Sequence, residues 1–337
     1  MPNDGHAYTE ARRQALRGLL AHADLSALLV TRPANVRYLT GFTGTYGALL
    51  LLHDRTVFFT DGRYRHQAEA EVPGAEVVLA PGDLVGAVGG VVRTSGDGLG
   101  FEPAGLTWGE GQRLRSGLPG QAVMAAPPLV EELREVKDER ELGAMREAAR
   151  LGGEALEGLL PALREGVTER QVALELELAM RRLGADGLAF ESIVAFGEQA
   201  AEPHHHPGDR PLAAGDWVKL DFGARVDGYC ADMTRTLVAG RASQRQRDLY
   251  ELVRGAQAAG LGDSFPHPTG HGIGLEIHEA PRLRSGSRDR VAAGTPVTIE
   301  PGVYLPGFGG VRIEDLVVAR PGGHELLTTT PKELLEL

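Results

Sequence analysis

The segment from residue 221 to residue 314 most restricts the fold of this 337-residue chain. Four acidic residues and one histidine stand there within short stretches that are typical of strands and turns. They are Asp221 in KLDFG, Asp232 in CADMTRT, His271 in TGHGIG, Glu300 in TIEPG and Glu314 in VRIED. Four converging carboxylates would repel one another strongly unless cations lay between them. The sequence therefore predicts a fold that gathers these residues around metal ions.

Two strand pairs of similar design would supply the carboxylates. The first carries Asp221 and Asp232, and the second carries Glu300 and Glu314, with one acidic residue on each strand. Side chains alternate between the faces of a strand, so inward acidic residues on paired strands lie a few ångströms apart. This weak internal repeat predicts two αβ halves that face each other across a shared cleft.

The second half is shorter than the first. The first half has two long helical patterns, at 139–160 and 168–183, and Thr168 with Gln171 predicts a capping box. The second half has one such pattern and lacks a partner helix of ~10–14 residues after Gly260. Either the protein has lost this helix or residues are missing from the chain. A Gly260-to-Leu261 separation much wider than ~3.8 Å would indicate missing residues.

Residues 8 to about 125 predict a separate α/β unit. Helical patterns alternate with apolar strands, and ALLLLHD with TVFFTD predicts a hairpin through Asp54 and Arg55. A Gly-rich stretch near 81–98 carries no predicted helix or strand, and NVRYLTGF is interpreted as a loop.

Pro127 and Pro128 mark the predicted domain boundary, because proline fixes φ and lacks a backbone N–H. We therefore predict an amino-terminal domain at 1–126 and a catalytic domain at 127–337.

Composition excludes several classes of partner. The 35 Lys and Arg against 46 Asp and Glu give a net charge of -11, which disfavours nucleic-acid and anionic membrane surfaces. The single cysteine, Cys230, cannot form an internal disulfide, and the first residues lack the pattern of a signal peptide. No apolar run approaches the ~20 residues that span a bilayer. We expect a cytoplasmic protein that acts on a small peptide.

The expected ligand set favours hydrolysis of an amide. Carboxylates can bridge two divalent cations ~3.5–4 Å apart, which would lower the pKa of a water toward ~7 and polarise an amide carbonyl. Oxygen-rich ligation with one imidazole suits Mn²⁺, Co²⁺ or Zn²⁺, and we expect Mn²⁺ first.

These motifs resemble those of the pita-bread metallopeptidases of the creatinase/methionine-aminopeptidase family, in the Xaa-Pro peptidase branch. The resemblance covers most of 190–334, through PHHHP, GDWVKLDFGARVDGYCADMTRT, HPTGHGIGLEIHEAP, GTPVTIEPGVY, GGVRIEDLVV and LLTTTPKEL. NVRYLTGFTG and FFTDGRY extend it to the first domain. It implies an α/β amino-terminal domain, an α+β pita-bread domain with pseudo-twofold halves, and a homodimer.

The resemblance also implies roles for the metal ligands. Asp221 and Glu314 would ligate one or both ions, and Asp232 would chelate. Glu300 would bridge the ions or shuttle a proton, and His271 would complete one site.

Further residues are implied to surround the substrate. His278 would stabilise the tetrahedral intermediate, and His204 and His267 would contact the scissile amide or the proline side. Imidazoles suit this work because either nitrogen can donate or accept near neutral pH. Arg312 would orient carboxylates or accept the substrate carboxylate.

His204 is chosen over its neighbours by spacing. It lies 17 residues before Asp221, the separation expected in this branch. His205 and His206 are expected to belong to a solvated loop or to bind metal adventitiously.

Members of the branch differ at the far end of the substrate. A prolidase needs a cation for the proline carboxylate of a dipeptide, whereas aminopeptidase P leaves that end open. Arg37 is a candidate for this cation if its loop reaches the cleft, and an outward surface arginine is the alternative. We therefore expect a prolidase, with aminopeptidase P and a non-catalytic peptide-binding module as alternatives.

Overall fold

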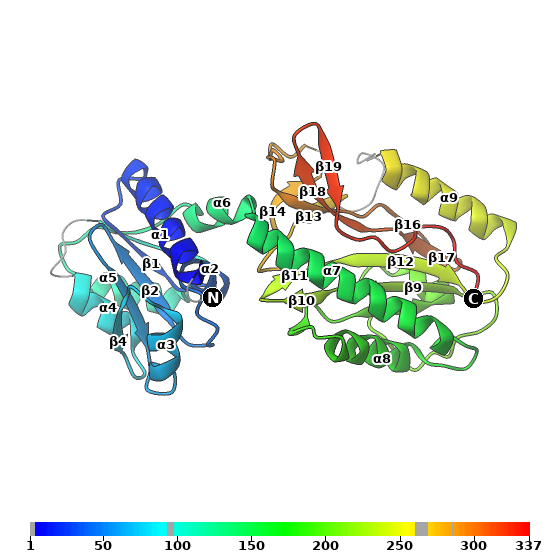
Figure 1. The fold of residues 1–337 in the computed structure, drawn as a ribbon, viewed down its shortest axis with the longest axis horizontal. Helices are drawn as coiled ribbons and strands as arrows, with labels where there is room; N and C mark the ends of the chain where they lie inside the picture. Colours follow the sequence, from blue (N-terminus) through cyan, green and yellow to red (C-terminus); the bar gives the residue numbers. More distant parts are fainter. Residues whose placement is uncertain (1–3, 93–97, 260–268, 285) are drawn as a thin grey trace. The chain divides into compact units, whose positions relative to one another are not determined.

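The computed structural model describes residues 4–92, 98–259, 269–284 and 286–337. The chain divides into two compact units, residues 1–134 and 135–337, and each is described by itself (Figure 1). The assignment of the domains to 1–126 and 127–337 remains a prediction.

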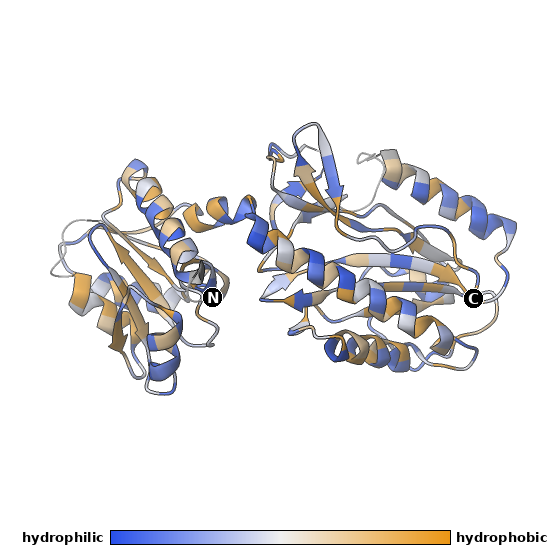
Figure 2. Ribbon diagram, in the orientation of Figure 1, coloured by the Kyte–Doolittle hydropathy of each residue, from blue (hydrophilic) through white to orange (hydrophobic). Residues whose placement is uncertain are grey.

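The first unit contains a six-stranded mixed sheet in the order β4-β3-β2-β1-β5-β6. Its strands are β1 (Ala27–Val30), β2 (Ala48–Leu52), β3 (Thr56–Thr60), β4 (Glu76–Leu79), β5 (Leu99–Phe101) and β6 (Val123–Ala125). β2 and β3 pair antiparallel with Leu51 opposite Thr56, which confirms the predicted hairpin. Figure 2 shows that these strands are mainly hydrophobic, as expected of a sheet covered on both faces.

Helices α1 (Asp4–His22), α2 (Pro33–Thr40), α3 (Arg65–Glu71), α4 (Leu84–Val92), α5 (Trp108–Gly117) and α6 (Leu129–Glu135) accompany this sheet. Two expectations were wrong. NVRYLTGF forms most of α2, which begins at Pro33 and ends before Gly41, a residue with a φ of 82°. The Gly-rich stretch contains α4, because Val85, Val88 and Val92 are buried in the core of the unit. This burial outweighs the cost of glycine in a helix, about 1 kcal/mol per residue.

The second unit is built from short strands that pair mainly antiparallel. They are β7 (Gly187–Leu188), β8 (Ile193–Phe196), β9 (Trp217–Phe222), β10 (Ala224–Val226), β11 (Tyr229–Cys230), β12 (Met233–Val238), β13 (Gly270–Gly272), β14 (Glu279–Leu283), β15 (Pro296–Ile299), β16 (Gly302–Leu305), β17 (Gly309–Arg312), β18 (Asp315–Arg320) and β19 (Gly323–Leu326). The largest sheet of this unit has five strands in the order β14-β13-β15-β18-β19, and two three-stranded sheets have the orders β12-β9-β8 and β11-β10-β7.

The two predicted strand pairs are present. β9 pairs antiparallel with β12, placing Asp221 opposite Thr234, and β15 pairs antiparallel with β18, placing Ile299 opposite Asp315. They are not simple hairpins, because β10 and β11 lie between the first pair in sequence, and β16 and β17 lie between the second.

Helices flank the strands of the second unit. α7 (Glu139–Leu159) and α8 (Glu169–Arg182) bury apolar residues in one core with β8, β9 and β12. Figure 2 shows hydrophilic and hydrophobic bands along α7, as expected of a helix with one buried face. The capping box of Thr168 and Gln171 at the start of α8 is confirmed.

The second half contributes α9 (Gln244–Ala259). The partner helix was expected to be missing after Gly260, and residues 260–268 lie outside the described residues, as does any separation between Gly260 and Leu261. Within the part of the chain that the structure describes, every helix is too short or too polar to traverse a bilayer.

Candidate metal centre

A cavity of about 620 Å³ in the second unit holds most of the predicted site residues. Its lining includes Asp221, Asp232, His271, Glu300, Glu314, His204, His278 and Arg312. The first and second strand pairs therefore contribute side chains to the same cavity. The metal-binding and substrate-binding roles of these residues remain predictions.

Three of the predicted ligands lie closest together. One ligand atom each from Asp232, His271 and Glu314 lies within 4.8 Å of the other two. Asp232 and Glu314 directly precede β12 and β18, and His271 lies in β13. Both carboxylates thus lie where a strand begins. Asp232 and Glu314 are 82 positions apart in the sequence, yet they belong to one cluster.

Glu300 adjoins this cluster from the end of β15. Its Oε1 lies 3.6 Å from His271 Nε2, and Asp232 Oδ2 lies 3.7 Å from the same nitrogen. His271 Nδ1 lies 3.0 Å from the Gly272 carbonyl oxygen, which can only accept, so Nδ1 carries the proton of the bond. The lone pair of a neutral His271 is therefore on Nε2, which faces the carboxylates, as a metal ligand requires.

Asp221 lies outside the closest cluster and is engaged by Arg312. Arg312 Nη2 donates to Asp221 Oδ2, and Arg312 Nε donates to Thr234 Oγ1 at 3.0 Å. Thr234 in turn donates to Glu314 Oε2 at 2.7 Å. One guanidinium therefore orients two of the predicted ligands, one directly and one through a hydroxyl.

Burial controls the electrostatics of the site. Burial, reinforced by neighbouring carboxylates, raises the pKa of Asp232 and of Glu314 well above the ordinary values. Burial, together with the charge of Asp221, raises the pKa of Glu300 to about 7. Burial lowers the pKa of His271 to about 4, and the charge of His278 adds to this effect. Without a bound cation, Asp232, Glu300 and Glu314 therefore retain protons that a cation would displace.

Two unsatisfied oxygens show that the donor set fits a divalent cation. Asp221 Oδ1 and Asp232 Oδ1 are buried and accept no hydrogen bond from any described residue. Buried carboxylate oxygens normally have partners. Oxygen-rich ligands with one imidazole suit a divalent metal, so the residues present can hold one.

Two exposed histidines border the ligands. The rings of His278 and His271 have centroids 4.4 Å apart. The pKa of His278 is lowered by partial burial first, then by the charges of Arg282 and His204. Both His204 and His278 line the cavity. The third predicted histidine, His267, lies outside the described residues.

The prediction that Arg37 lies in a loop is wrong. Arg37 lies in the last turn of α2, where it is half-buried. The described residues that line the large cavity all belong to the second unit, and Arg37 is not among them. Its contact with substrate remains a prediction.

The sequence interpretation missed two residues at this cavity. His205 is buried, which makes the expected solvated position wrong. Arg282, on β14, is exposed and lines the cavity. The sequence offered only weak signals for them, a run of three histidines and a basic residue after HEAP.

The glycines around His271 permit close backbone approach. A Cβ at Gly270 would collide with the Thr298 carbonyl, and a Cβ at Gly272 would collide with the Ala280 carbonyl. Close backbone packing on both sides of His271 therefore accounts for the glycines that flank it.

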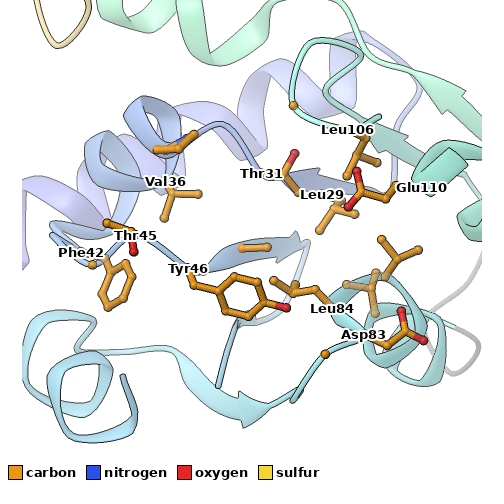
Figure 3. Close-up of a pocket in the computed structure, with 18 of the residues that line it drawn as sticks. Leu29, Thr31, Val36, Phe42, Thr45, Tyr46, Asp83, Leu84, Leu106 and Glu110 are labelled. Carbon is orange, nitrogen blue, oxygen red and sulfur yellow. The ribbon is translucent and has the colours of Figure 1, made fainter. Parts of the chain in front are cut away.

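A second cavity, of about 220 Å³, lies in the first unit. Figure 3 shows Leu29, Val36, Leu84 and Leu106 around it, with Tyr46 extending along its wall. None of the predicted site residues lines it.

Comparison with known proteins identifies related chains for both units. Metallopeptidase family M24 matches residues 143–262 and 256–321, and the creatinase/prolidase N-terminal domain matches residues 12–136. Uncharacterized peptidase YqhT of Bacillus subtilis is 37% identical over 350 residues, which cover 96% of this chain and 99% of YqhT. The two M24 matches meet at 256–262, where a helix was expected to be missing.

Solved structures of relatives have the same fold over nearly their whole length. The Xaa-Pro dipeptidase from Bacillus anthracis has a TM-score of 0.93 and 37% identity, covering 98% of this chain and 100% of its own. The X-Pro aminopeptidase from Thermotoga maritima has a TM-score of 0.89 and 30% identity, with coverages of 96% and 99%. The shared fold therefore does not separate the two kinds of peptidase.

Proposed function

Because this chain belongs to metallopeptidase family M24, we propose that it is a prolidase that hydrolyses Xaa-Pro dipeptides. The observation that carries the proposal is the convergence of Asp232, His271 and Glu314 in a cavity that Asp221 and Glu300 also line. The similarity to the Xaa-Pro dipeptidase from Bacillus anthracis supports the substrate class.

The proposed ligands for two divalent cations are Asp221, Asp232, His271, Glu300 and Glu314. Cations held there would supply Lewis acidity, which polarises an amide carbonyl and makes water a nucleophile near neutral pH. Mn²⁺ is the proposed metal, because the donor set is rich in oxygen and contains one imidazole.

The side chains of the cavity would handle protons and developing charge. Glu300 lies on its wall, where its carboxylate would accept a proton from the attacking water and deliver it to the departing proline nitrogen. His204 and His278 are exposed to the cavity and would donate hydrogen bonds to the substrate oxygen as negative charge develops. Arg312 would keep Asp221 and Glu314 oriented.

Among the described residues that line the cavity, Arg282 is the best placed to bind the carboxylate of a dipeptide. Two arginines are among the described residues that line the cavity, Arg282 and Arg312. Arg312 is 4% exposed and is engaged by Asp221, Thr234 and Tyr304. Arg282 is exposed, and its charge reaches His278. A guanidinium there can pair with a carboxylate through two hydrogen bonds.

The test compares Ala-Pro with Ala-Pro-Ala in added Mn²⁺, before and after chelation. Cleavage of the dipeptide alone, lost on chelation and restored by Mn²⁺, is the expected result. Efficient cleavage of the tripeptide would support aminopeptidase P, which the similarity to the Thermotoga maritima enzyme favours as the second candidate. A protein that binds metal and cleaves neither peptide would contradict both and support a binding module.

We also propose that the protein is a cytoplasmic homodimer, as the family resemblance and the composition suggest. Light scattering of the purified chain tests the dimer: a mass twice the 35.9 kDa of one chain is expected.

A further inference from the structure

His205 is the buried member of three consecutive histidines. It is 8% exposed, whereas His204 and His206 are exposed. Its Nε2 lies 2.9 Å from Glu169 Oε2, and its Nδ1 lies 2.8 Å from Glu202 Oε2. Carboxylate oxygens accept in such bonds, so a ring N–H donates to the glutamate that it faces. Hydrogen bonds to charged groups are stronger than those between neutral groups.

Glu169 connects His205 to three parts of the second unit. It is the first residue of α8 and is 0% exposed. Its Oε1 accepts a hydrogen bond from Phe196 N at 2.8 Å, and its Oε2 accepts one from Gly208 N at 2.9 Å. The carboxylate thus joins the end of β8, the start of α8 and the segment that follows the histidines.

The main chain before His204 is held by two buried basic side chains. Lys219, a fully buried residue of β9, donates from Nζ to the carbonyl oxygens of Ala200, at 3.1 Å, and Glu202. Arg312 Nη1 donates to the Pro203 carbonyl at 3.4 Å. His204 is therefore the exposed residue between a main chain fixed at Glu202 and Pro203 and a side chain fixed at His205.

We propose that His205, held by Glu169, is a positioning residue for His204. The buried pair fixes the main chain so that the His204 imidazole stays in the cavity, which His278 also lines. Both ring nitrogens of His205 are engaged by glutamates, Glu169 and Glu202, so it would act on the reaction through its neighbour. This inference rests on the proposed function, in which His204 donates to the substrate.

The test is a double-mutant cycle of His204→Ala and His205→Ala, measured as kcat/KM on Ala-Pro with saturating Mn²⁺. Loss of a residue that orients a functional side chain typically costs about 10–100-fold, and that is the loss expected for His205→Ala. In the His204→Ala background, His205→Ala should cost less than about 3-fold, because coupled residues are not additive. A residue that only stabilises the fold would not show this dependence on background.

Two further variants keep the result decisive. Glu169→Gln removes the charge but keeps an oxygen that can accept from the main chain, so it should give a smaller loss with the same dependence on His204. It also replaces the test if His205→Ala does not fold. Arg170→Ala is the matched control, because it removes an exposed pair with Asp209 beside the buried one and should leave kcat/KM unchanged.

The outcomes separate this inference from the proposed function. If the wild-type protein cleaves Ala-Pro and His205→Ala does so equally well, the positioning role is wrong. An equal loss in both backgrounds, or loss of bound Mn²⁺, would also overturn it. If the wild-type protein cleaves no Xaa-Pro peptide, the proposed function fails first.

Discussion

The cavity at the predicted metal centre and the cavity of about 220 Å³ in the first unit are lined by different chemistry. The cavity of the first unit has apolar walls, and its charged residues, Asp83, Glu110 and Arg113, are exposed or half-buried. The cavity of the second unit contains Asp232 and Glu314, which are at most 5% exposed. Both cavities could accept a small molecule. Burying a carboxylate costs free energy, so the buried acidic groups of the cavity in the second unit indicate a charged ligand there.

Buried carboxylates that destabilise a fold indicate a functional site. Buried carboxylates destabilise a fold unless a proton, an arginine or a cation neutralises them. In the second unit, Arg312 neutralises Asp221, while the other three carboxylates have raised pKa values. The first unit has no comparable cluster of acidic residues among those lining its cavity. Five predictions test this contrast.

The largest effect is expected for Glu314→Ala. Removing this carboxylate takes one of the three converging ligand atoms from the site, so both Mn²⁺ binding and Ala-Pro cleavage should fall below detection. Metal content by mass spectrometry and kcat/KM measure the two effects. Glu336→Ala, at an exposed ion pair, is the control and should behave as wild type. Full activity in Glu314→Ala would refute the metal assignment.

Arg282→Ala should weaken dipeptide cleavage specifically. The lost charge-assisted hydrogen bonds are worth about 1.5–3 kcal/mol, so KM for Ala-Pro should rise about 10–100-fold. Ala-Pro-Ala should be affected much less, because its carboxylate lies further along the substrate. Arg284→Ala, at an exposed position on the same segment, is the matched control.

Arg37→Ala in the same assay tests the role first expected for that residue. A loss on the dipeptide that exceeds the loss on the tripeptide would support Arg37 as the carboxylate partner. Equal losses on both peptides for Arg37→Ala and for Arg282→Ala would leave neither residue as the partner.

Metal affinity should rise with pH between 5.5 and 7.5. The pKa of Glu300 is about 7, and those of Asp232 and Glu314 are also raised, so these groups hold protons at low pH that Mn²⁺ must displace. His271, with a pKa of about 4, contributes no proton in this range. Each released proton strengthens apparent binding by up to about tenfold per pH unit. Calorimetry in buffers of different ionisation enthalpy measures the release, and a pH-independent affinity would contradict it.

The smallest effect on activity is expected for Val85→Ala in the first unit. Val85 is 7% exposed and lies in both the core and the smaller cavity. Loss of its buried methyl groups should cost about 1–2 kcal/mol of stability, measured by urea unfolding. The kcat/KM for Ala-Pro should stay within about 2-fold of wild type. A large change in activity would give the smaller cavity a part in the reaction.

Local patterns in the sequence predicted much of the fold. The hairpin of β2 and β3 and the capping box of Thr168 and Gln171 depend on residues that are close in the sequence, and both are confirmed. The fold class and the family are confirmed as well, because their motifs are specific in order and spacing. α2 and α4 were missed, because their valines and leucines are helical only in the context of the core they cover.

The sequence by itself determined which residue types can bind a divalent cation, because four carboxylates and one imidazole stand in strand-like motifs between residues 221 and 314. Tertiary structure alone decided which side chain faces which partner. His205 is buried because Glu169, 36 residues away, accepts its hydrogen bond, and Asp221 is oriented by Arg312, 91 residues away. Such pairs form only when distant segments pack together, and a buried polar group is stable only where they supply its partner.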